Sequence, residues 1–542
     1  MTKIDYVSLE GLSPFEIKDE LIKLAQEEAR TAQAMYLNAG RGNPNWIATR
    51  PREAYFLLGQ FAITESKRVR DDAVGIGGMP ARDGVAGRLT DWLDAHADMP
   101  GADTLRDCVA HAIEAYGFEP DAFVHELVDG IIGDNYPVPD RALVHTERIV
   151  HDYLMWAMCA GHRPEGRFDL FPVEGGTAAM CYIFKSLKAN RLLNPGDTIA
   201  LGTPIFTPYL EMPDLEDYAL NTVHIPTRQE NRFQFAPEDL AKLEDPSVKA
   251  FFLVNPGNPS AVALTEETIA ALVKLVTEKR PDLIILTDDV YGTFVQNFQS
   301  LLGHLPRNTI GVYSYSKYFG CTGWRLGVIA LHEDNVLDEK LAALPEEVKQ
   351  ALDRRYATLT LEPRGIRFID RIVADSRDVA LNHTAGLSLP QQVMMCLFSL
   401  VELTDTQKAY QKACRDIVWQ RFRLLEAALG IEAGVGPRFD AYYGIIDFEF
   451  WLRRYVGEEV VEWVKENIHP LDISFKLAEL HGIVLLNGSG FDAPNWSARV
   501  SFANLDDEAY DAIGRAVRSV ARGYVQAYQA AQAATAAATE GP

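Results

Sequence analysis

The feature that most constrains the fold is an alternation of short apolar runs with helical patterns between residues 136 and 318. The runs DTIAL, KAFFLV, DLIILTDD and NTIGVYSYS are rich in apolar and β-branched residues, and amphipathic stretches such as TEETIAALVKLVTEK separate them. Strands that alternate with helices along a chain build parallel sheets that are covered on both faces. This part of the sequence therefore predicts an α/β domain around a mainly parallel sheet.

The sequence on either side of this region has a different character. Residues 13–35 repeat apolar side chains at helical spacing, and residues 334–425 are mostly helical in pattern. Strand-like runs return between residues 440 and 505 in YYGIIDFEF, GIVLLNG and SARVSFANL. These runs predict a second, smaller α+β domain. The Ala-rich residues 531–542 are typical of a fraying helix end.

Charge and cysteine content narrow the possible partners and cofactors. The 76 acidic and 52 basic side chains give a net charge of −24, which repels nucleic acid and anionic membrane surfaces. The longest apolar stretch, near residues 393–401, is about half of what crosses a bilayer. The six cysteines form no CxxC pair, and neither a metal motif nor a targeting segment is apparent. We therefore expect a cytoplasmic protein without a metal.

The most informative segment is SYSKYFGCTGWRLG, residues 314–327. Lys317 follows a strand-like run, and Arg325 comes eight positions later. A partly desolvated lysine at the end of a strand can have its pKa lowered enough to form an imine with an aldehyde cofactor. Ser314 and Arg325 could then bind the phosphate of that cofactor. Taken alone, this segment also fits a surface lysine on a loop.

The segment resembles the lysine signature of fold-type I pyridoxal-phosphate enzymes, specifically the aspartate aminotransferase branch. Upstream, LIILTDDVYGTF matches the D-x-x-Y signature of that branch. The resemblance implies that Asp288 binds the pyridinium nitrogen of pyridoxal 5′-phosphate (PLP) and that Tyr291 binds its phenolic oxygen. FPVEGGTAAM resembles the phosphate-binding loop at the start of a helix, where Gly175, Gly176 and Thr177 would offer backbone N–H groups.

Four further segments match the family in the expected order. FFLVNPGNPSA resembles the NPxNPTG turn and aligns Asn258 with the asparagine that contacts the phenolic oxygen. TPIFTPYLE resembles the turn that stacks an aromatic residue, here Phe206, on the cofactor ring. GDNYPVPDR puts Tyr136 in the place of a tyrosine that reaches the phosphate across a dimer interface. NWSARVSFANL matches the strand whose arginine, here Arg499, binds the α-carboxylate of the substrate.

The overall pattern, which includes LNAGRGNPNW near the start, is similar to that of the bacterial L-aspartate 4-decarboxylase family. The resemblance implies a carbon–carbon lyase that converts L-aspartate into L-alanine and CO₂ through a ketimine and an enamine. It also implies slower aspartate aminotransferase activity and a homo-oligomer of dimers with shared active sites, up to a dodecamer. An aminotransferase that uses 2-oxoglutarate is the alternative. Arg41, between two glycines, could line the substrate site or face solvent.

The expected fold is that of a fold-type I PLP-dependent transferase. It has a large domain with a mainly parallel, seven-stranded sheet covered by helices, and a smaller α+β domain built from both termini. The expected parts are an N-terminal segment that joins the small domain (1–50), a family-specific helical insertion (51–135), the large PLP-binding domain (136–385), the small C-terminal domain (386–530) and the Ala-rich tail (531–542).

Overall fold

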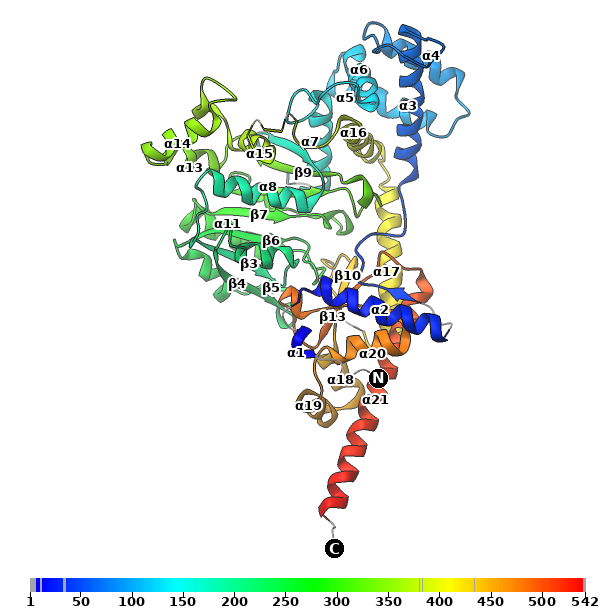
Figure 1. Ribbon diagram of the computed structural model, residues 1–542, viewed down its shortest axis with the longest axis vertical. Helices are drawn as coiled ribbons and strands as arrows, with labels where there is room; N and C mark the ends of the chain where they lie inside the picture. Colours follow the sequence, from blue (N-terminus) through cyan, green and yellow to red (C-terminus); the bar gives the residue numbers. More distant parts are fainter. Residues whose placement is uncertain are drawn as a thin grey trace.

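The computed structural model describes residues 6–9, 12–32, 36–160, 162–379, 381–382, 384–432 and 434–539. A sheet of eight strands, in the order β2-β9-β8-β7-β6-β3-β4-β5, lies at its centre (Figure 1). The run from β8 to β4 is parallel, and β9 pairs antiparallel with both β2 and β8. The mainly parallel sheet is therefore confirmed. Its strands are β2 (Phe168–Val173), β3 (Thr198–Thr203), β4 (Asn221–Arg228), β5 (Gln234–Phe235), β6 (Val248–Val254), β7 (Ile284–Asp288), β8 (Thr309–Ser314) and β9 (Gly327–His332).

The sheet has one strand more than the seven expected. The additional strand is β5, which has two residues and pairs antiparallel with the end of β4. Because two residues are too few to show the alternation that marks a strand, the sequence pattern could not reveal it.

Helices cover both faces of the sheet. On β6, Phe251 and Leu253 belong to one apolar cluster with Ile269 of helix α11 (Glu266–Lys279). The neighbouring Phe252 points to the other face, where its ring lies 5.0 Å from that of Phe184 on α8 (Gly176–Ala189). This burial on both faces explains why the central strands are apolar throughout.

A cluster of helices precedes the large domain. It consists of α3 (Thr49–Val69), α4 (Val85–Ala95), α5 (Ala102–Tyr116) and α6 (Pro120–Ile132), which lie together at the top of Figure 1. Helices α3, α5 and α6 pack on α16 (Leu389–Thr404), and so does α7 (Val144–Met158). The apolar stretch near residues 393–401 is thus buried inside this cluster. In the described part of the chain, no helix is long and apolar enough to cross a membrane.

Both termini contribute to a second unit with its own small sheet. Strands β10 (Tyr443–Asp447), β13 (Ser497–Ser501) and β12 (Leu486–Asn487) form an antiparallel sheet, and β1 (Leu37–Asn38) pairs in parallel with β11 (Ile483–Val484). Helix α2 (Pro14–Ala32) packs on α20 (Asp472–His481), and α17 (Ala409–Leu429) packs along α21 (Asp507–Thr539). The N-terminal segment therefore joins the C-terminal elements, as an α+β domain from both termini requires.

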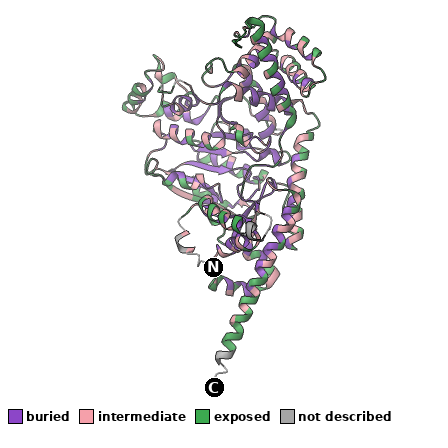
Figure 2. Ribbon diagram, turned by 45° about the vertical axis from the view of Figure 1, so that its right-hand side comes forward, coloured by how far each residue is buried: buried purple, intermediate pink, exposed green. Residues whose placement is uncertain are grey.

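The remaining α-helices of the described residues are shorter elements in and around these units. They are α1 (Tyr6–Leu9), α9 (Pro208–Glu211), α10 (Pro237–Leu240), α12 (Leu301–His304), α13 (Val336–Ala343), α14 (Glu346–Tyr356), α15 (Phe368–Ser376), α18 (Phe448–Val456) and α19 (Glu458–Asn467). Figure 2 shows that the far end of α21 is largely exposed, which fits the helix end predicted for residues 531–542.

Two boundaries differ from the sequence-based expectation. The run YYGIIDFEF is a strand only as far as Asp447, because the Asp447 carboxylate accepts a hydrogen bond from the Phe450 N–H at 2.9 Å and starts α18. The run GIVLLNG forms two short strands, β11 and β12, in different sheets. By contrast, the start of the helix expected over residues 13–35 is confirmed, since α2 begins at Pro14; residues 33–35 lie outside the described residues.

Candidate active site

A cavity of about 350 Å³ lies at the carboxyl ends of the parallel strands. Val254, Asp288 and Ser314, the last residues of β6, β7 and β8, meet there with residues of the N-terminal segment and of β13. This edge is where open α/β sheets bind their ligands. The predicted residues that line the cavity are Arg41, Gly176, Thr177, Phe206, Asn258, Asp288, Tyr291, Ser314, Lys317, Arg325 and Arg499.

Lys317 is one of these lining residues. It comes three residues after the end of β8 and is partly buried, and its Nζ donates a hydrogen bond to the Gly42 carbonyl oxygen at 3.2 Å. Its position at the end of a sheet strand is the one that the sequence predicted. A single, weak protein contact leaves the amine available to react.

One end of the cavity is suited to a phosphate. Helix α8 starts here after Gly175, and no side chain caps its first N–H groups. A Cβ atom at Gly175 would come within 2.5 Å of Arg325 Nη2, which donates to the Glu174 carbonyl oxygen at 3.0 Å. The Ser314 hydroxyl adds a further polar group at the same end. Uncapped amides, a hydroxyl and a guanidinium together favour a dianion.

Asp288 supplies an anion elsewhere in the cavity. Its carboxylate accepts hydrogen bonds from the Val290 N–H at 3.3 Å and from the Tyr209 hydroxyl at 3.4 Å. Burial raises the pKa of Asp288 to about 6, against the smaller lowering effects of these bonds and of Lys317. A protonated ring nitrogen beside this carboxylate would favour its ionised form.

Asp289, the second residue of the DD pair, has a different role. Its carboxylate accepts hydrogen bonds from Thr287 at 2.6 Å and from Ser300, inside the protein. Burial raises the pKa of Asp289 to about 7. Because side chains alternate across a strand end, only Asp288 reaches the cavity.

Arg499 is held with one donor free. It is 2% exposed, and its two terminal nitrogens donate to Asn258 Oδ1 at 3.0 Å and to the Gly40 carbonyl oxygen at 2.9 Å. Its Nε is buried and has no hydrogen-bond partner among the described residues. A buried donor without a partner is costly, so this position is suited to a carboxylate of a ligand.

Ten side chains that line the cavity were not predicted as site residues from the sequence. Among them are Phe15 and Lys18 of α2, Tyr209 of α9 and Tyr443 of β10. The Phe15 ring meets the Phe206 ring edge to face at 6.2 Å. The pattern of residues 13–35 indicated only an amphipathic helix, and nothing in it showed which residues of that helix would reach a site about 300 residues further along the chain.

The comparisons with known proteins agree with this arrangement. Residues 174–389 match the family model "Aminotransferase class I and II". A Pseudomonas sp protein, named bifunctional aspartate aminotransferase and L-aspartate beta-decarboxylase, is 49% identical over 527 residues, which are 97% of this chain and 99% of that protein. The chain belongs to the class I and II aminotransferase family. The match to the Pseudomonas protein also confirms the resemblance to the aspartate decarboxylases.

Solved structures support the fold of this class I and II aminotransferase. Aspartate aminotransferase from Thermus thermophilus with maleate has a TM-score of 0.54 at 18% identity and covers 96% of this chain and 100% of that one. Aromatic aminotransferase from Pyrococcus horikoshii has a TM-score of 0.55 at 17% identity, and the match covers 90% of this chain and 95% of that one. These likenesses show the fold alone.

The cofactor of this aminotransferase family is PLP, and the residues of the cavity fit it. The uncapped start of α8 with Arg325 is suited to the phosphate, and the partly buried Asp288 is suited to a ring nitrogen that carries a proton. Lys317 offers an amine, and the unpaired Nε of Arg499 offers a carboxylate site. The phosphate and ring nitrogen of PLP and the carboxylate of an amino acid would thus each lie beside an opposite charge or a hydrogen-bond donor.

Tyr136 lies outside this cavity. It is 68% exposed, on the loop between α6 and α7. An exposed position is what a residue needs in order to reach the site of a second subunit, so its role in a shared site stays a prediction. The sequence left open whether Arg41 lines the substrate site or faces solvent. In the structure it lines the cavity and is also exposed.

A shared site can be tested by complementation. Tyr136→Ala and Arg499→Ala variants, each nearly inactive alone, are expected to regain activity when their subunits are mixed, because one of the two sites in each heterodimer is intact. Random pairing should restore roughly a quarter of the wild-type activity. Heterodimers that form, as shown by differently tagged subunits, yet regain no activity would exclude a role of Tyr136 in the partner's site.

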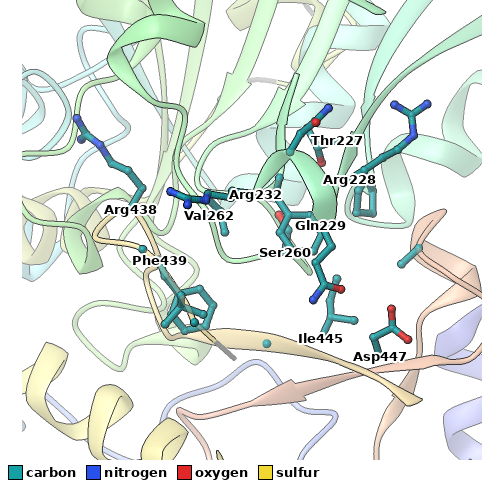
Figure 3. Close-up of a pocket in the computed structure, with 18 of the residues that line it drawn as sticks. Thr227, Arg228, Gln229, Arg232, Ser260, Val262, Arg438, Phe439, Ile445 and Asp447 are labelled. Carbon is teal, nitrogen blue, oxygen red and sulfur yellow. The ribbon is translucent and has the colours of Figure 1, made fainter. Parts of the chain in front are cut away.

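A larger cavity of about 1000 Å³ lies between the β4–β5 hairpin and the small domain. Figure 3 shows Arg228 and Arg438 directed away from the centre of this cavity. Each makes an ion pair with a carboxylate, at 2.8 Å for Arg228 and at 3.4 Å for Arg438. Ser260 lines this cavity, whereas Lys317 and Asp288 do not. We therefore place the chemistry of the enzyme in the smaller cavity.

Proposed function

We propose that this chain catalyses the PLP-dependent β-decarboxylation of L-aspartate to L-alanine and CO₂, with slower aspartate aminotransferase activity. The observation that carries this function is the identity of 49% over 97% of the chain to the Pseudomonas protein named for both activities. The alternative is an aminotransferase of aspartate, or of another amino acid, that depends on 2-oxoglutarate.

We assign a separate role in the reaction to each group of residues in the cavity. When bound, PLP supplies an imine that accepts electrons from the substrate carbons. We assign Lys317 as the residue that carries the cofactor and then moves the proton at Cα. We assign Asp288 to the ring nitrogen and Tyr291 and Asn258 to the phenolic oxygen. The residues assigned to the phosphate and the ring face are Gly175, Gly176, Thr177, Phe206, Ser314, Arg325 and, from a second subunit, Tyr136.

The two carboxylates of aspartate need different treatment. Arg499, which is buried and held by Asn258 and Gly40, would fix the α-carboxylate and thereby orient the substrate. The side-chain carboxylate must lose its charge as CO₂, so a strong ion pair to it would stabilise the ground state and slow the reaction. We assign Arg41 to the substrate side of the cavity. Its exposure weakens any ion pair that it makes there.

The wider organisation is also part of the proposal. We infer a homo-oligomer built from dimers, up to a dodecamer, in the cytoplasm. The net charge of −24 supports an enzyme that binds neither nucleic acid nor a membrane surface. The domain limits proposed are those given above, with residues 51–135 as the helical insertion that contains most of α3 and all of α4, α5 and α6.

The reaction can be tested without a keto acid acceptor. With L-aspartate alone, the holoenzyme is expected to release C4 as CO₂ in equimolar amount with alanine. Occasional release of a keto acid should leave the cofactor aminated, so activity should decline slowly and return on adding a trace of pyruvate. In D₂O, the alanine should carry deuterium at both Cα and Cβ.

The aminotransferase alternative predicts a different result in the same assay. Strict dependence on 2-oxoglutarate, with oxaloacetate as the product and no enzymatic CO₂, would contradict the decarboxylase. Heat-inactivated enzyme is the control for spontaneous decarboxylation of oxaloacetate.

A further inference from the structure

Tyr443, the first residue of β10, places a hydroxyl group in the cavity that the assignments above do not use. Its side chain is 2% exposed, and it is one of the lining residues. Its hydroxyl lies 3.3 Å from that of Tyr291. The preceding residue, Tyr442, does not line the cavity, and its hydroxyl donates to the Gly42 carbonyl oxygen at 2.7 Å. Two adjacent buried tyrosines therefore differ in whether they can reach a substrate.

The Tyr443 hydroxyl and the Lys317 amine both lie close to one point in the cavity wall. A Cβ atom built on Gly42 would be 2.5 Å from Tyr443 Oη and 3.0 Å from Lys317 Nζ. Both reactive atoms are thus within 3.0 Å of a single position in the cavity wall. Neighbouring carbons of one small substrate could be served by the two groups.

Arg499 ties Tyr443 to the substrate end of the cavity. Its guanidinium lies 4.1 Å from the centre of the Tyr443 ring, and β10 and β13 pair with Ile445 opposite Arg499. A substrate whose α-carboxylate is bound by Arg499 therefore has its carbon chain beside this tyrosine.

The proposed reaction needs protons at two carbons. Lys317 serves Cα, and loss of CO₂ leaves an electron pair at Cβ that must also be protonated. We propose that Tyr443 is a catalytic residue whose hydroxyl donates this proton to Cβ. The O–H bond of Tyr443 breaks as the Cβ–H bond forms, which leaves a tyrosinate that regains its proton from solvent. This inference rests on the proposed decarboxylase function.

The surroundings of Tyr443 stabilise the tyrosinate. Burial raises the pKa of its hydroxyl, and Asp440 adds a smaller increase. Arg499, Lys317 and the hydrogen bond with Tyr291 together lower this pKa by a larger amount. The net result is a pKa below the ordinary value for tyrosine. By contrast, burial raises the pKa of Tyr291 and Tyr442 well above that value. Of these three tyrosines, Tyr443 is thus the one suited to give up its proton.

Two reactions of one variant test the inference. Tyr443→Phe is expected to lower the rate of CO₂ release by about 10²- to 10³-fold, the usual loss when a general acid is removed. Its transamination between L-aspartate and 2-oxoglutarate should fall by a much smaller factor than its CO₂ release, because transamination needs no proton at Cβ. Tyr442→Phe, the matched loss of a buried hydroxyl, should change both rates in parallel. Retained transamination also shows that the variant folds and binds the cofactor.

A measurement on the apoenzyme gives a second readout. Arg518, which donates a hydrogen bond to the Tyr455 hydroxyl, also lowers the pKa of Tyr455. In a near-ultraviolet titration of tyrosinate, wild type and Tyr442→Phe should therefore show two tyrosines, Tyr443 and Tyr455, that ionise below the ordinary pKa of about 10. Tyr443→Phe should show only one. An identical titration of Tyr443→Phe and wild type would contradict the inference.

The outcomes separate the inference from the function on which it rests. If wild type releases CO₂ and Tyr443→Phe releases it equally fast, the inference alone is wrong. If Tyr443→Phe loses CO₂ release and transamination to the same extent, Tyr443 is structural and not the proton donor. If wild type itself releases no CO₂, the proposed function fails, and the inference fails with it.

Discussion

Replacing Lys317 with alanine is expected to reduce turnover of L-aspartate by at least about 10⁴-fold, because the residue both carries the cofactor and moves the proton at Cα. CO₂ and alanine should fall together. In wild-type holoenzyme, borohydride reduction followed by peptide mass analysis should find the cofactor attached to Lys317, and the variant should show no attachment.

The variant should still fold, which makes the result interpretable. Lys317 Nζ makes one hydrogen bond, to the Gly42 carbonyl oxygen, and such a bond contributes about 1 kcal/mol to stability. Lys412→Ala is a matched control, since Lys412 is exposed on α17 and pairs with Asp416 four residues later. Near-normal turnover of Lys317→Ala, together with a reducible adduct on another lysine, would exclude Lys317 as the cofactor residue.

Replacing Asp288 with alanine or asparagine is expected to lower kcat by about 10²- to 10⁴-fold, because an anion that keeps the ring nitrogen protonated contributes several kcal/mol to the rate. Steady-state kinetics of CO₂ release would measure this loss. Asp289→Asn is the matched control, because Asp289 bonds Thr287 and Ser300 away from the cavity. It should cost stability but change kcat by less than about tenfold. A loss below tenfold for Asp288→Asn would remove Asp288 from the site.

Asp288→Asn, which should slow the holoenzyme, is also expected to stabilise the apoenzyme. Because burial raises the pKa of Asp288 from 3.8 to about 6, the folded apoenzyme favours its protonated form. That contribution to stability is complete below pH about 4 and is lost as the pH rises through about 6. Asp288→Asn should therefore raise the Tm of the apoenzyme at neutral pH and should not raise it at pH 4. Saturating wild type with cofactor should reduce the difference.

The sequence was informative about this site wherever a residue is tied to a strand end. Asp288 and Lys317 could be found because apolar runs reveal β7 and β8, and parallel strands bring their carboxyl ends to one edge. Tyr443 could not be found in this way. It lies at the beginning of a strand in another sheet, and only packing between the two units brings it to the cavity. Local pattern carries no information about such a contact.

The same limit applies to the choice between similar neighbours. Which aspartate of the DD pair faces the cavity was inferred from a family signature, whereas the structure shows that Thr287 and Ser300 hold the other one. The short β5 and the cap at Asp447 are also consequences of individual hydrogen bonds, and they do not arise from a periodic pattern. Composition and periodicity predicted the layers of sheet and helices, whereas individual hydrogen bonds determine where each helix and strand begins and ends.

The bond between Arg499 and the Gly40 carbonyl oxygen joins residues 459 positions apart in the chain. During synthesis, Gly40 leaves the ribosome long before β13 exists, and at 5–20 residues per second the wait is on the order of half a minute. The large α/β domain can fold in that interval, since β2 to β9 are all complete by His332. Even if the sheet forms in that interval, the carboxylate site stays incomplete and unable to hold aspartate until β13 has been made.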